Sequence, residues 1–514
     1  MALALLQYLA ITAALIALIL LAARLLFPAP VNTALEKTTA LPVAQTGILA
    51  QTIDHHSAKH TGASGILTLQ NGFDAFAARI RLANAAVSSI DVQYYIWRTD
   101  MTGHLLFKAL LRAADRGVRV RILLDDNGIH RLDHQLAEMD AHPNIEVRLY
   151  NPFPLRRLKR LAYAFDFSRL NHRMHNKAFT VDGRASILGG RNVGDEYFGT
   201  GAIPLQIDLD VLAVGEVVPT IAADFDRYWN ADIVIPTARV LRKRGDSRQI
   251  ETWLTRIEND PKFETYYALL DEPDAQNALS RGAQEMDWTD AVLVSDAPDI
   301  RPGRVPKRKL FINRLLDAVG TIENRFDGVT PYFVPGRAGV KALAALQKKG
   351  VRVRMLTNSL EATNMLPVHA GYSKHRAKML RAGITLFELR AQAGGASSMD
   401  ILGPLGSSGS NLHAKTFAVD GKRIFVGSFN FDPRSATLNT EMGLLIESAA
   451  MAERMHAAFD EGLSELAWRV TLHKRGPKWI NTAENIETRM EPGTTFPKRV
   501  ALKIVGWLPI EWLL

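Results

Sequence analysis

The feature that most constrains this chain is a motif that occurs twice, with His413 lying 238 residues after His175. Both copies read H-x-K-x-x-x-x-D followed by G-[GS]-x-N at the same internal distance. The matched residues are His175, Lys177, Asp182 and Asn192 in the first copy, and His413, Lys415, Asp420 and Asn430 in the second. Two matches with a shared asparagine indicate a duplicated functional unit, because a single short motif is easily produced by chance.

A second repeated stretch shows that the duplication is larger than the motif. Residues 349–356 (KGVRVRML) repeat residues 116–123 (RGVRVRIL) at an offset of 233. Near-equal offsets in two unrelated stretches predict that a whole domain is duplicated. The two motifs are therefore expected to meet at the seam between two halves related by a pseudo-two-fold axis.

Hydrophobic patterning predicts the fold class of each half. Residues 71–85 and 104–116 have helical periodicity, whereas residues 89–97, 118–124 and 145–150 read as buried strands. The strand-like 326–334 and helix-like 338–348 repeat this order later in the chain. We predict an α/β fold made of two duplicated α/β sandwich domains with mixed sheets.

The N-terminus predicts a membrane anchor. Residues 1–23 contain no charged side chain and as a helix would span roughly 30–35 Å. No Lys or Arg precedes this long apolar run, which favours a single transmembrane helix over a cleaved signal peptide. Arg24 and Lys37 follow it, and the positive-inside tendency then predicts a single-pass protein of the inner (cytoplasmic) membrane with a cytoplasmic catalytic domain.

Composition limits the partners. The 514 residues carry 62 Lys and Arg against 53 Asp and Glu, a net charge of +9 that suits nucleic acid or anionic lipid equally well. Cysteine is absent, which excludes disulfides, thiol nucleophiles and Cys-ligated metals.

The predicted domains are a transmembrane anchor (1–27), a linker (28–64), a first repeat (65–255), a helical connector (256–290), a second repeat (291–490) and a membrane-interface tail (491–514).

Three segments leave alternatives open. His55, His56 and His60 in the linker are expected in a solvated loop rather than at a metal. The basic cluster 155–161 is either a solvated face or a headgroup contact. The tail, with Trp507 and Trp512, lies either at the membrane interface or packed on the core.

The motif spacing favours phosphate chemistry. Residues i and i+2 of a strand face the same side, so His175 projects with Lys177, and His413 with Lys415. Lysines and asparagine amides would neutralise non-bridging phosphate oxygens. One imidazole would attack phosphorus while the other protonates the leaving oxygen. Because lysines supply the charge, we predict a site that needs no metal and no other cofactor.

These residues resemble the paired motifs of the phospholipase D superfamily, and further stretches resemble its bacterial cardiolipin synthases. The stretches are 91–97 (DVQYYIW), 123–127 (LLDDN), 173–177 (RMHNK), 189–198 (GGRNVGDEYF), 430–435 (NFDPRS) and 438–441 (LNTE). The resemblance implies two phospholipase D-like domains and ping-pong phosphodiester exchange through a phosphohistidine. A phosphatidyl group would move to phosphatidylglycerol from a donor phospholipid, which is either a second phosphatidylglycerol or phosphatidylethanolamine.

The resemblance also implies roles for individual residues. His175 is the expected nucleophile and His413 the general acid, with Lys177, Lys415, Asn192 and Asn430 on phosphate. Glu441 is expected to orient His413, and Asp208 to orient His175, with Asp210 as the fallback. Asp182 and Asp420 belong to the catalytic motifs but are expected to support turns. Ser428 offers a hydroxyl to phosphate where the first copy has Gly190.

Two other functions remain open on the sequence. The same chemistry with water as acceptor would make a phospholipase or a nuclease. A non-catalytic lipid-binding protein is disfavoured because both motifs are intact. The apolar N-terminus and the Trp-containing tail favour a membrane and phospholipids over nucleic acid.

Overall fold

The computed structural model describes residues 1–32, 37–199, 206–241, 248–260, 263–264, 285–299, 305–363, 365–391, 411–474 and 476–514. Its described α-helices are α1 (Ala2–Leu26), α2 (Ile48–Ser57), α3 (Gly72–Ala85), α4 (Met101–Asp115), α5 (Asp133–Met139), α6 (Lys159–Leu170), α7 (Asp195–Phe198), α8 (Val218–Trp229), α9 (Thr237–Val240), α10 (Arg248–Glu258), α13 (Phe311–Val319), α14 (Gly336–Lys348), α15 (Leu366–Arg381), α16 (Pro433–Thr437), α17 (Ala449–Ala457), α18 (Leu463–Leu466) and α19 (Phe496–Trp507). Most of the predicted connector 256–290 lies outside the described residues.

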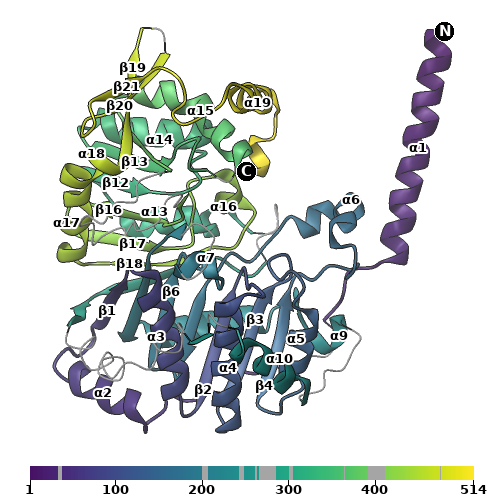
Figure 1. Ribbon diagram of the computed structural model, residues 1–514, viewed down its shortest axis with the longest axis vertical. Coiled ribbons are helices and arrows are strands. Elements are labelled where there is room, and N and C mark those ends of the chain that lie inside the picture. The colour runs from purple at the N-terminus through teal and green to yellow at the C-terminus, as the bar shows by residue number, and fades with distance from the viewer. Residues whose placement is uncertain are drawn as a thin grey trace.

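Two large mixed sheets organise the molecule, one in each half (Figure 1). The first has the order β10 (Asp287–Thr289), β1 (Ser64–Leu69), β8 (Asp210–Gly215), β6 (Ala185–Gly189), β5 (Ala178–Val181), β2 (Ser89–Tyr94), β3 (Arg119–Asp125), β4 (Ile145–Tyr150), β9 (Val234–Pro236). The second has the order β11 (Ala291–Ser295), β18 (Met442–Ile446), β17 (Arg423–Gly427), β16 (Thr416–Val419), β12 (Arg325–Val329), β13 (Arg352–Asn358), β14 (Thr385–Leu389), β19 (Ala467–His473), β20 (Gly476–Asn481), β21 (Ile486–Thr488).

The two sheets repeat one topology. The run β1-β8-β6-β5-β2-β3-β4 in the first sheet has the same order as β11-β18-β17-β16-β12-β13-β14 in the second. In both, the central strand pairs parallel on one side and antiparallel on the other, as β2 does with β3 and β5. A buried ion pair is duplicated with it, Asp91 with Arg121 and Asp327 with Arg354. The predicted duplicated α/β fold is confirmed.

The motif in each half enters a tight hairpin. Strands β5 and β6 are joined at Asp182 and Gly183, with φ of 56° and 63°, and β16 and β17 at Asp420 and Gly421, with φ of 55° and 66°. Positive φ at both central residues is the geometry whose twist matches paired antiparallel strands. The Asp-Gly pairs therefore fix the register of both hairpins.

Packing between the halves forms one shared core. A single hydrophobic cluster contains Val211 and Ala213 of β8 together with Val426 of β17 and Leu444 of β18. Helices α8 and α17 add to it, for example through Met451. Each half also has a core of its own. Because the seam is apolar and buried, the two halves form one rigid frame for residues at its edge.

Helix α1 stands away from the body of the molecule (Figure 1). It is long and apolar enough to cross a membrane, with a mean hydropathy of 2.5 over its most apolar window and no buried residue. Its C-terminal end approaches α6, where the rings of Phe27 and Phe165 lie 6.4 Å apart. In a membrane protein such an uncovered helix is the expected transmembrane segment.

Two expectations from the sequence, those for the linker and for the basic cluster 155–161, are refined by the structure. Residues 48–57, predicted as loop, form helix α2, so His55 and His56 are helical, and His60 stacks on Trp288 at 4.8 Å. In the basic cluster, Arg156 and Lys159 are engaged by Asp126 at 2.5 and 2.9 Å, which leaves fewer cations for another partner.

The C-terminal tail packs on the second half while exposing apolar side chains. Leu502 of α19 is buried in a small cluster with α15, and Lys498 Nζ donates to the Leu360 carbonyl oxygen at 2.6 Å. Trp507 is nevertheless 87% exposed and Ile504 55% exposed. The tail therefore packs on the core through one face of its helix, and the membrane-interface role of its exposed face stays a prediction.

Candidate active site

The two motif histidines meet at the seam between the halves. Each lies just before the first strand of its hairpin, because β5 begins at Ala178 and β16 at Thr416. His175 and His413 are 8% and 9% exposed, and the lysines of both motifs are more deeply buried. The predicted convergence of the motif histidines and lysines at the seam is thus present in the structure.

Each histidine is held by a carboxylate from the opposite half. His175 Nδ1 lies 2.9 Å from Glu441 Oε2, and His413 Nδ1 lies 2.5 Å from Asp208 Oδ2. The expected assignment, in which Glu441 orients His413 and Asp208 orients His175, is wrong. Engagement of Nδ1 leaves Nε2 of each ring as the nitrogen available for chemistry.

Backbone pairing across the seam explains the crossing. The His175 N–H donates to the Thr440 carbonyl oxygen at 2.9 Å, and Thr440 immediately precedes Glu441. In the other direction, β15 (Asn411–Leu412) pairs parallel with β7 (Gln206–Ile207), and the His413 N–H donates to the Ile207 carbonyl oxygen at 2.7 Å. Each histidine is therefore aligned with the residue before its carboxylate.

The remaining expected carboxylate and hydroxyl have other partners. Asp210, the fallback for orienting a histidine, instead bonds Arg79 at 2.7 Å. The Ser428 hydroxyl donates to Glu441 Oε2 and accepts from the Met442 N–H at 3.0 Å. It therefore supports the carboxylate that holds His175, and its expected contact with phosphate stays a prediction.

Gly190 stands where Ser428 stands in the second copy for a steric reason. A Cβ at position 190 would lie 2.0 Å from Asp208 Oδ1. In the first half the carboxylate itself fills the space that a side chain occupies in the second half. The difference between the two motifs thus follows from the placement of Asp208.

Burial and like charge weaken the cationic forms of the site. Desolvation, and then Lys177 and Lys415, hold the pKa of His175 well below its usual range. Desolvation and Lys415 lower the pKa of His413 to about 4, against the attraction of Asp208. Burial also lowers the pKa of Lys415 to about 8 and that of Lys177 well below its usual range. An anion between these groups would favour their charged forms.

The pKa values of the two carboxylates are shifted in opposite directions. Burial raises the pKa of Glu441 to about 7, although Lys177 favours its ionised form. Burial also opposes ionisation of Asp208, but His413 and Lys415 hold its pKa below its usual range. The site is therefore chemically asymmetric despite its pseudo-symmetric geometry.

The two motif aspartates lie in the hairpin turns and bind backbone, as the sequence led us to expect. Asp182 accepts from the N–H groups of Val87, Ser88 and Ser89 at 3.0, 2.8 and 2.9 Å. Asp420 accepts from the N–H groups of residues 323–325 at 2.7–2.9 Å. Their grouping with the catalytic residues reflects the motif rather than contact with a reacting atom.

The motif asparagines and Glu441 place polar side-chain atoms at the site, some of which have no hydrogen-bond partner among the described residues. Asn192 Oδ1 accepts from the Ile96 N–H at 3.1 Å. Within the described part of the chain, Asn430 Oδ1 and Glu441 Oε1 are buried without a hydrogen-bond partner. Buried polar atoms are normally satisfied, so such orphans mark a place where a polar ligand fits.

Two aromatic residues complete the site and were not assigned a role from the sequence. The ring of Tyr95 lies edge-on to His175 at 5.2 Å, and that of Tyr197 lies edge-on to His413 at 5.3 Å. Both lie in stretches that carry the family resemblance, but only the folded arrangement shows that each tyrosine faces a histidine.

Comparison with known proteins identifies the family. The family described as "Cardiolipin synthase, PLD-like domain" matches residues 79–229 and 315–463, one match in each half. Cardiolipin synthase C of Escherichia coli strain K12 is 46% identical over 460 residues, covering 89% of this chain and 97% of that protein. The chain belongs to the cardiolipin synthase family of phospholipase D-like proteins. The family resemblance inferred from the sequence is confirmed.

More distant relatives agree with this membership. A probable cardiolipin synthase of Bacillus subtilis strain 168 is 25% identical, over 80% of this chain and 69% of that protein. The crystal structure of phosphatidylserine synthase from Haemophilus influenzae superimposes with a TM-score of 0.57 at 14% identity, covering 90% of this chain and all of that one. That likeness shows the shared fold. With the uncovered helix α1, the family membership makes this a membrane protein.

Proposed function

We propose that this protein is a cardiolipin synthase that transfers a phosphatidyl group to the headgroup hydroxyl of phosphatidylglycerol. The observation that carries the proposal is the crossed pair of histidine–carboxylate contacts, which places two oriented imidazoles beside two buried lysines. Identity of 46% to cardiolipin synthase C over nearly its whole length supports the choice of reaction.

In the first step, Nε2 of His175 attacks phosphorus and the bond to the leaving alkoxide breaks. His413 gives its proton to that oxygen, and the headgroup leaves as an alcohol. In the second step, neutral His413 takes the proton of the acceptor hydroxyl, whose oxygen displaces His175 from phosphorus. Lys177 and Lys415, with Asn192 and Asn430, bind the non-bridging oxygens throughout.

The low pKa of His413 suits this cycle only when the anionic diester is bound. The free site holds both imidazoles mostly neutral, which keeps His175 nucleophilic. The arriving phosphodiester raises the pKa of His413 by opposing the repulsion from Lys415, and so supplies a proton donor where it is needed.

A lipid assay tests the reaction. The purified full chain is incubated in mixed micelles with phosphatidylglycerol alone and with added phosphatidylethanolamine, and products are identified by mass. Cardiolipin is the expected product. Phosphatidic acid as the sole product would instead make the enzyme a hydrolase that uses water.

The two histidines are distinguished with an activated substrate, phosphatidyl-p-nitrophenol. Its leaving group departs without protonation, so His413→Ala is expected to release one equivalent of nitrophenol and to accumulate phosphorylated His175. His175→Ala is expected to release none. A covalent adduct on His413 in the His175→Ala variant would reverse the two roles.

We further propose that the enzyme lies in the inner membrane with both sheets on the cytoplasmic side. The support is the placement of the first basic side chains, Arg24 and Lys37, after the apolar helix. On this arrangement the α1 anchor holds the site beside the leaflet that supplies its lipids.

A further inference from the structure

A groove of about 710 Å³ lies on the second half, away from the histidines. Its walls come from α15, the β19–β20 hairpin, the chain at 489–491 and α19. This volume is within the range of small-molecule sites. None of its lining residues belongs to the motif set that defines the active site.

The groove is strongly cationic. Lys374, Arg489, Arg499 and Lys503 line it, and within the described residues none of these four lies within ion-pair distance of a carboxylate. Arg499 Nη1 donates to the Thr494 carbonyl oxygen, and Lys374 Nζ donates to the Leu508 carbonyl oxygen at 3.3 Å. Neutral carbonyl oxygens therefore hold both side chains in place, and their positive charges are not neutralised by these contacts.

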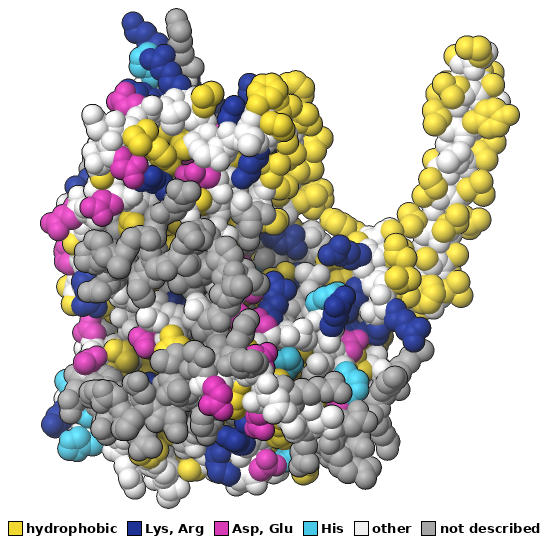
Figure 2. Space-filling view, in the orientation of Figure 1, with side chains coloured by type: hydrophobic (Ala, Val, Ile, Leu, Met, Phe, Trp, Pro, Cys, Tyr) yellow, Lys and Arg dark blue, Asp and Glu magenta, His cyan; other side chains and the backbone are white. Residues whose placement is uncertain are grey.

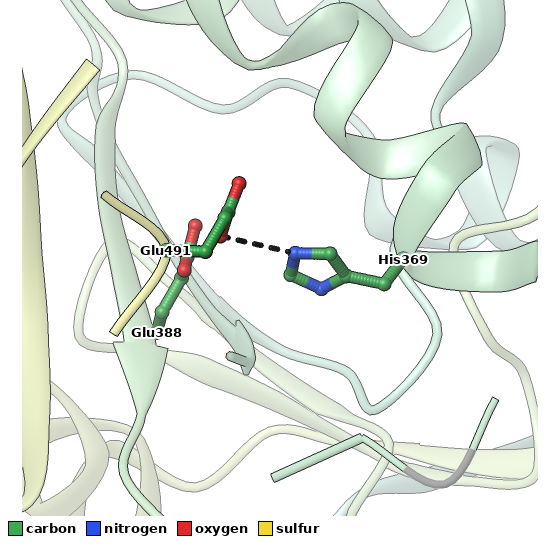
Figure 3. Close-up of side chains that lie close together, drawn as sticks. All are labelled: His369, Glu388 and Glu491. Carbon is green, nitrogen blue, oxygen red and sulfur yellow. Dashed lines mark ion pairs between the residues drawn. The ribbon is translucent and has the colours of Figure 1, made fainter. Parts of the chain in front are cut away.

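The carboxylate that lines the groove is already neutralised. Figure 3 shows Glu491 beside Glu388 and His369, a grouping that would suit a metal ion. The guanidinium of Arg376 lies among them instead, 2.7 Å from Glu491 and 3.0 Å from both Glu388 and His369. Burial opposes the charge of Glu491, but Arg376 holds its pKa at about 2. The four other cations are therefore not cancelled by Glu491.

The other wall of the groove is apolar and aromatic. Phe496, Val500 and Trp507 of α19 line it and are 71%, 38% and 87% exposed. Figure 2 shows the apolar side chains of this region gathered on one face with Lys and Arg side chains beside them. Aromatic residues next to basic ones are typical of surfaces that meet the headgroup region of a bilayer.

We propose that this groove binds one molecule of anionic phospholipid, distinct from the substrate at the histidines. Its phosphate would lie between Arg489, Arg499 and Lys503, and its acyl chains would follow Phe496, Val500 and Trp507 into the bilayer. Charge complementarity selects an anionic lipid over a zwitterionic one. Exposed aromatic side chains beside the cations select a lipid over free phosphate. No covalent change of this lipid is involved.

The C-terminal residues connect the groove to the seam between the two halves, where the active site lies. The chain continues from α19 to Leu514, whose carbonyl oxygen accepts from the Arg434 N–H at 2.8 Å. The Arg434 guanidinium donates to Asn171 Oδ1 at 2.8 Å, four residues before His175. The bound lipid therefore holds the second half at the membrane and steadies a contact beside the site.

Binding is measured without turnover in the full chain carrying His175→Ala. The protein in maltoside micelles is titrated with dioleoyl phosphatidylglycerol or dioleoyl phosphatidylcholine, and retained lipids are counted by native mass spectrometry. Two molecules of phosphatidylglycerol are expected per chain. Adding Arg489→Gln, Arg499→Gln and Lys503→Gln is expected to lower occupancy by the second molecule at least tenfold.

A matched control removes the same charge elsewhere. Lys341→Gln, Lys348→Gln and Lys349→Gln change three exposed cations in and after α14 and are expected to leave both molecules bound. Trp507→Ala, at a side chain too exposed to affect folding, is expected to weaken the second molecule as well. It gives an independent result if the triple variant melts at a lower temperature than its parent.

Three outcomes would overturn the proposal. They are retention of two molecules by both groove variants, equal retention of phosphatidylcholine, and displacement of the second lipid by millimolar inorganic phosphate. The last would identify a free phosphate site. Because the measurement counts bound lipid in an inactive chain, its result does not depend on which reaction the enzyme performs.

Discussion

At the scale of single residues, the crossed carboxylates make each half depend on the other. Glu441 and Asp208 fix the tautomer and direction of His175 and His413 without touching the substrate phosphorus. Motif matching could identify all four residues from the sequence, but not their pairing. Pairing depends on the short contacts of Thr440 and Ile207 across the seam, and such contacts leave no periodic signal in the chain.

Removing the charge of either positioning carboxylate should lower turnover. Glu441→Gln and Asp208→Asn are each expected to reduce kcat about 10²-fold or more with little change in KM, because the rings lose orientation and stabilisation of their charged forms. Glu447→Gln, at the exposed carboxylate just after β18, is the matched control and should retain full activity. Full activity in Glu441→Gln would refute its positioning role.

The lowered pKa of His413 predicts how stability depends on pH. A histidine whose pKa falls from 6.5 to about 4 on folding contributes stability that is present above 6.5 and lost as pH falls towards 4. The wild type should therefore lose up to about 3 kcal/mol relative to His413→Asn over that window, at about 1.4 kcal/mol per pKa unit. Thermal unfolding at pH 7 and pH 4.5 measures the difference. An equal pH dependence in both proteins would contradict the shift.

At the scale of elements, the residue that follows β6 shows why the two motif copies cannot exchange their sequences. Gly190→Ser copies the second motif into the first, but its Cβ would meet Asp208 Oδ1 at 2.0 Å. We expect Asp208 to move from His413 and kcat to fall at least tenfold. Ala345→Ser, at an exposed position of α14, is the control and should retain full activity. Normal activity in Gly190→Ser would show that the carboxylate has another place to lie.

The motif aspartates act on the hairpins rather than on the chemistry. Asp182→Ala removes the acceptor of three N–H groups and is expected to cost about 2–4 kcal/mol of stability. Activity per folded molecule should stay within about threefold. Asp115→Ala, at an exposed ion pair with His142, should cost less than about 0.5 kcal/mol in the same thermal unfolding measurement. An inactive but stable Asp182→Ala protein would place that carboxylate in the chemistry.

Helices and strands could be predicted from the sequence where one hydrophobic period dominates a segment. They could not be predicted where tertiary contacts determine the local structure. The repeated strands 118–124 and 351–356 and their helices were recognisable because aliphatic residues alternate with arginine at period two in both copies of the pattern. Helix α2 was missed because its polar residues are stabilised by burial of Leu49, Ala50 and Ile53 rather than by a marked pattern. The helix of the tail was left undecided for the opposite reason, since it buries one face and exposes another.

At the scale of the whole molecule, the shared apolar core explains how a site can be built from two distant motifs. Val211 and Ala213 of the first half pack with Val426 and Leu444 of the second, so the seam cannot open without exposing apolar surface. Rigid docking keeps each imidazole within hydrogen-bond distance of its carboxylate. Duplication could be predicted from the two offsets, whereas the shared core required the register of both sheets.

The proposed orientation in the membrane can be tested by labelling single introduced cysteines, because the sequence contains no cysteine of its own. Single Ala2→Cys and Lys348→Cys variants place one thiol on each side of α1. If the orientation proposed from Arg24 and Lys37 holds, a membrane-impermeant maleimide applied to intact spheroplasts should label Ala2→Cys and should reach Lys348→Cys only after lysis. The reverse pattern would place both sheets outside the membrane. Loss of the N-terminal label from the mature protein, with Lys348→Cys labelled before lysis, would instead identify residues 1–27 as a cleaved signal.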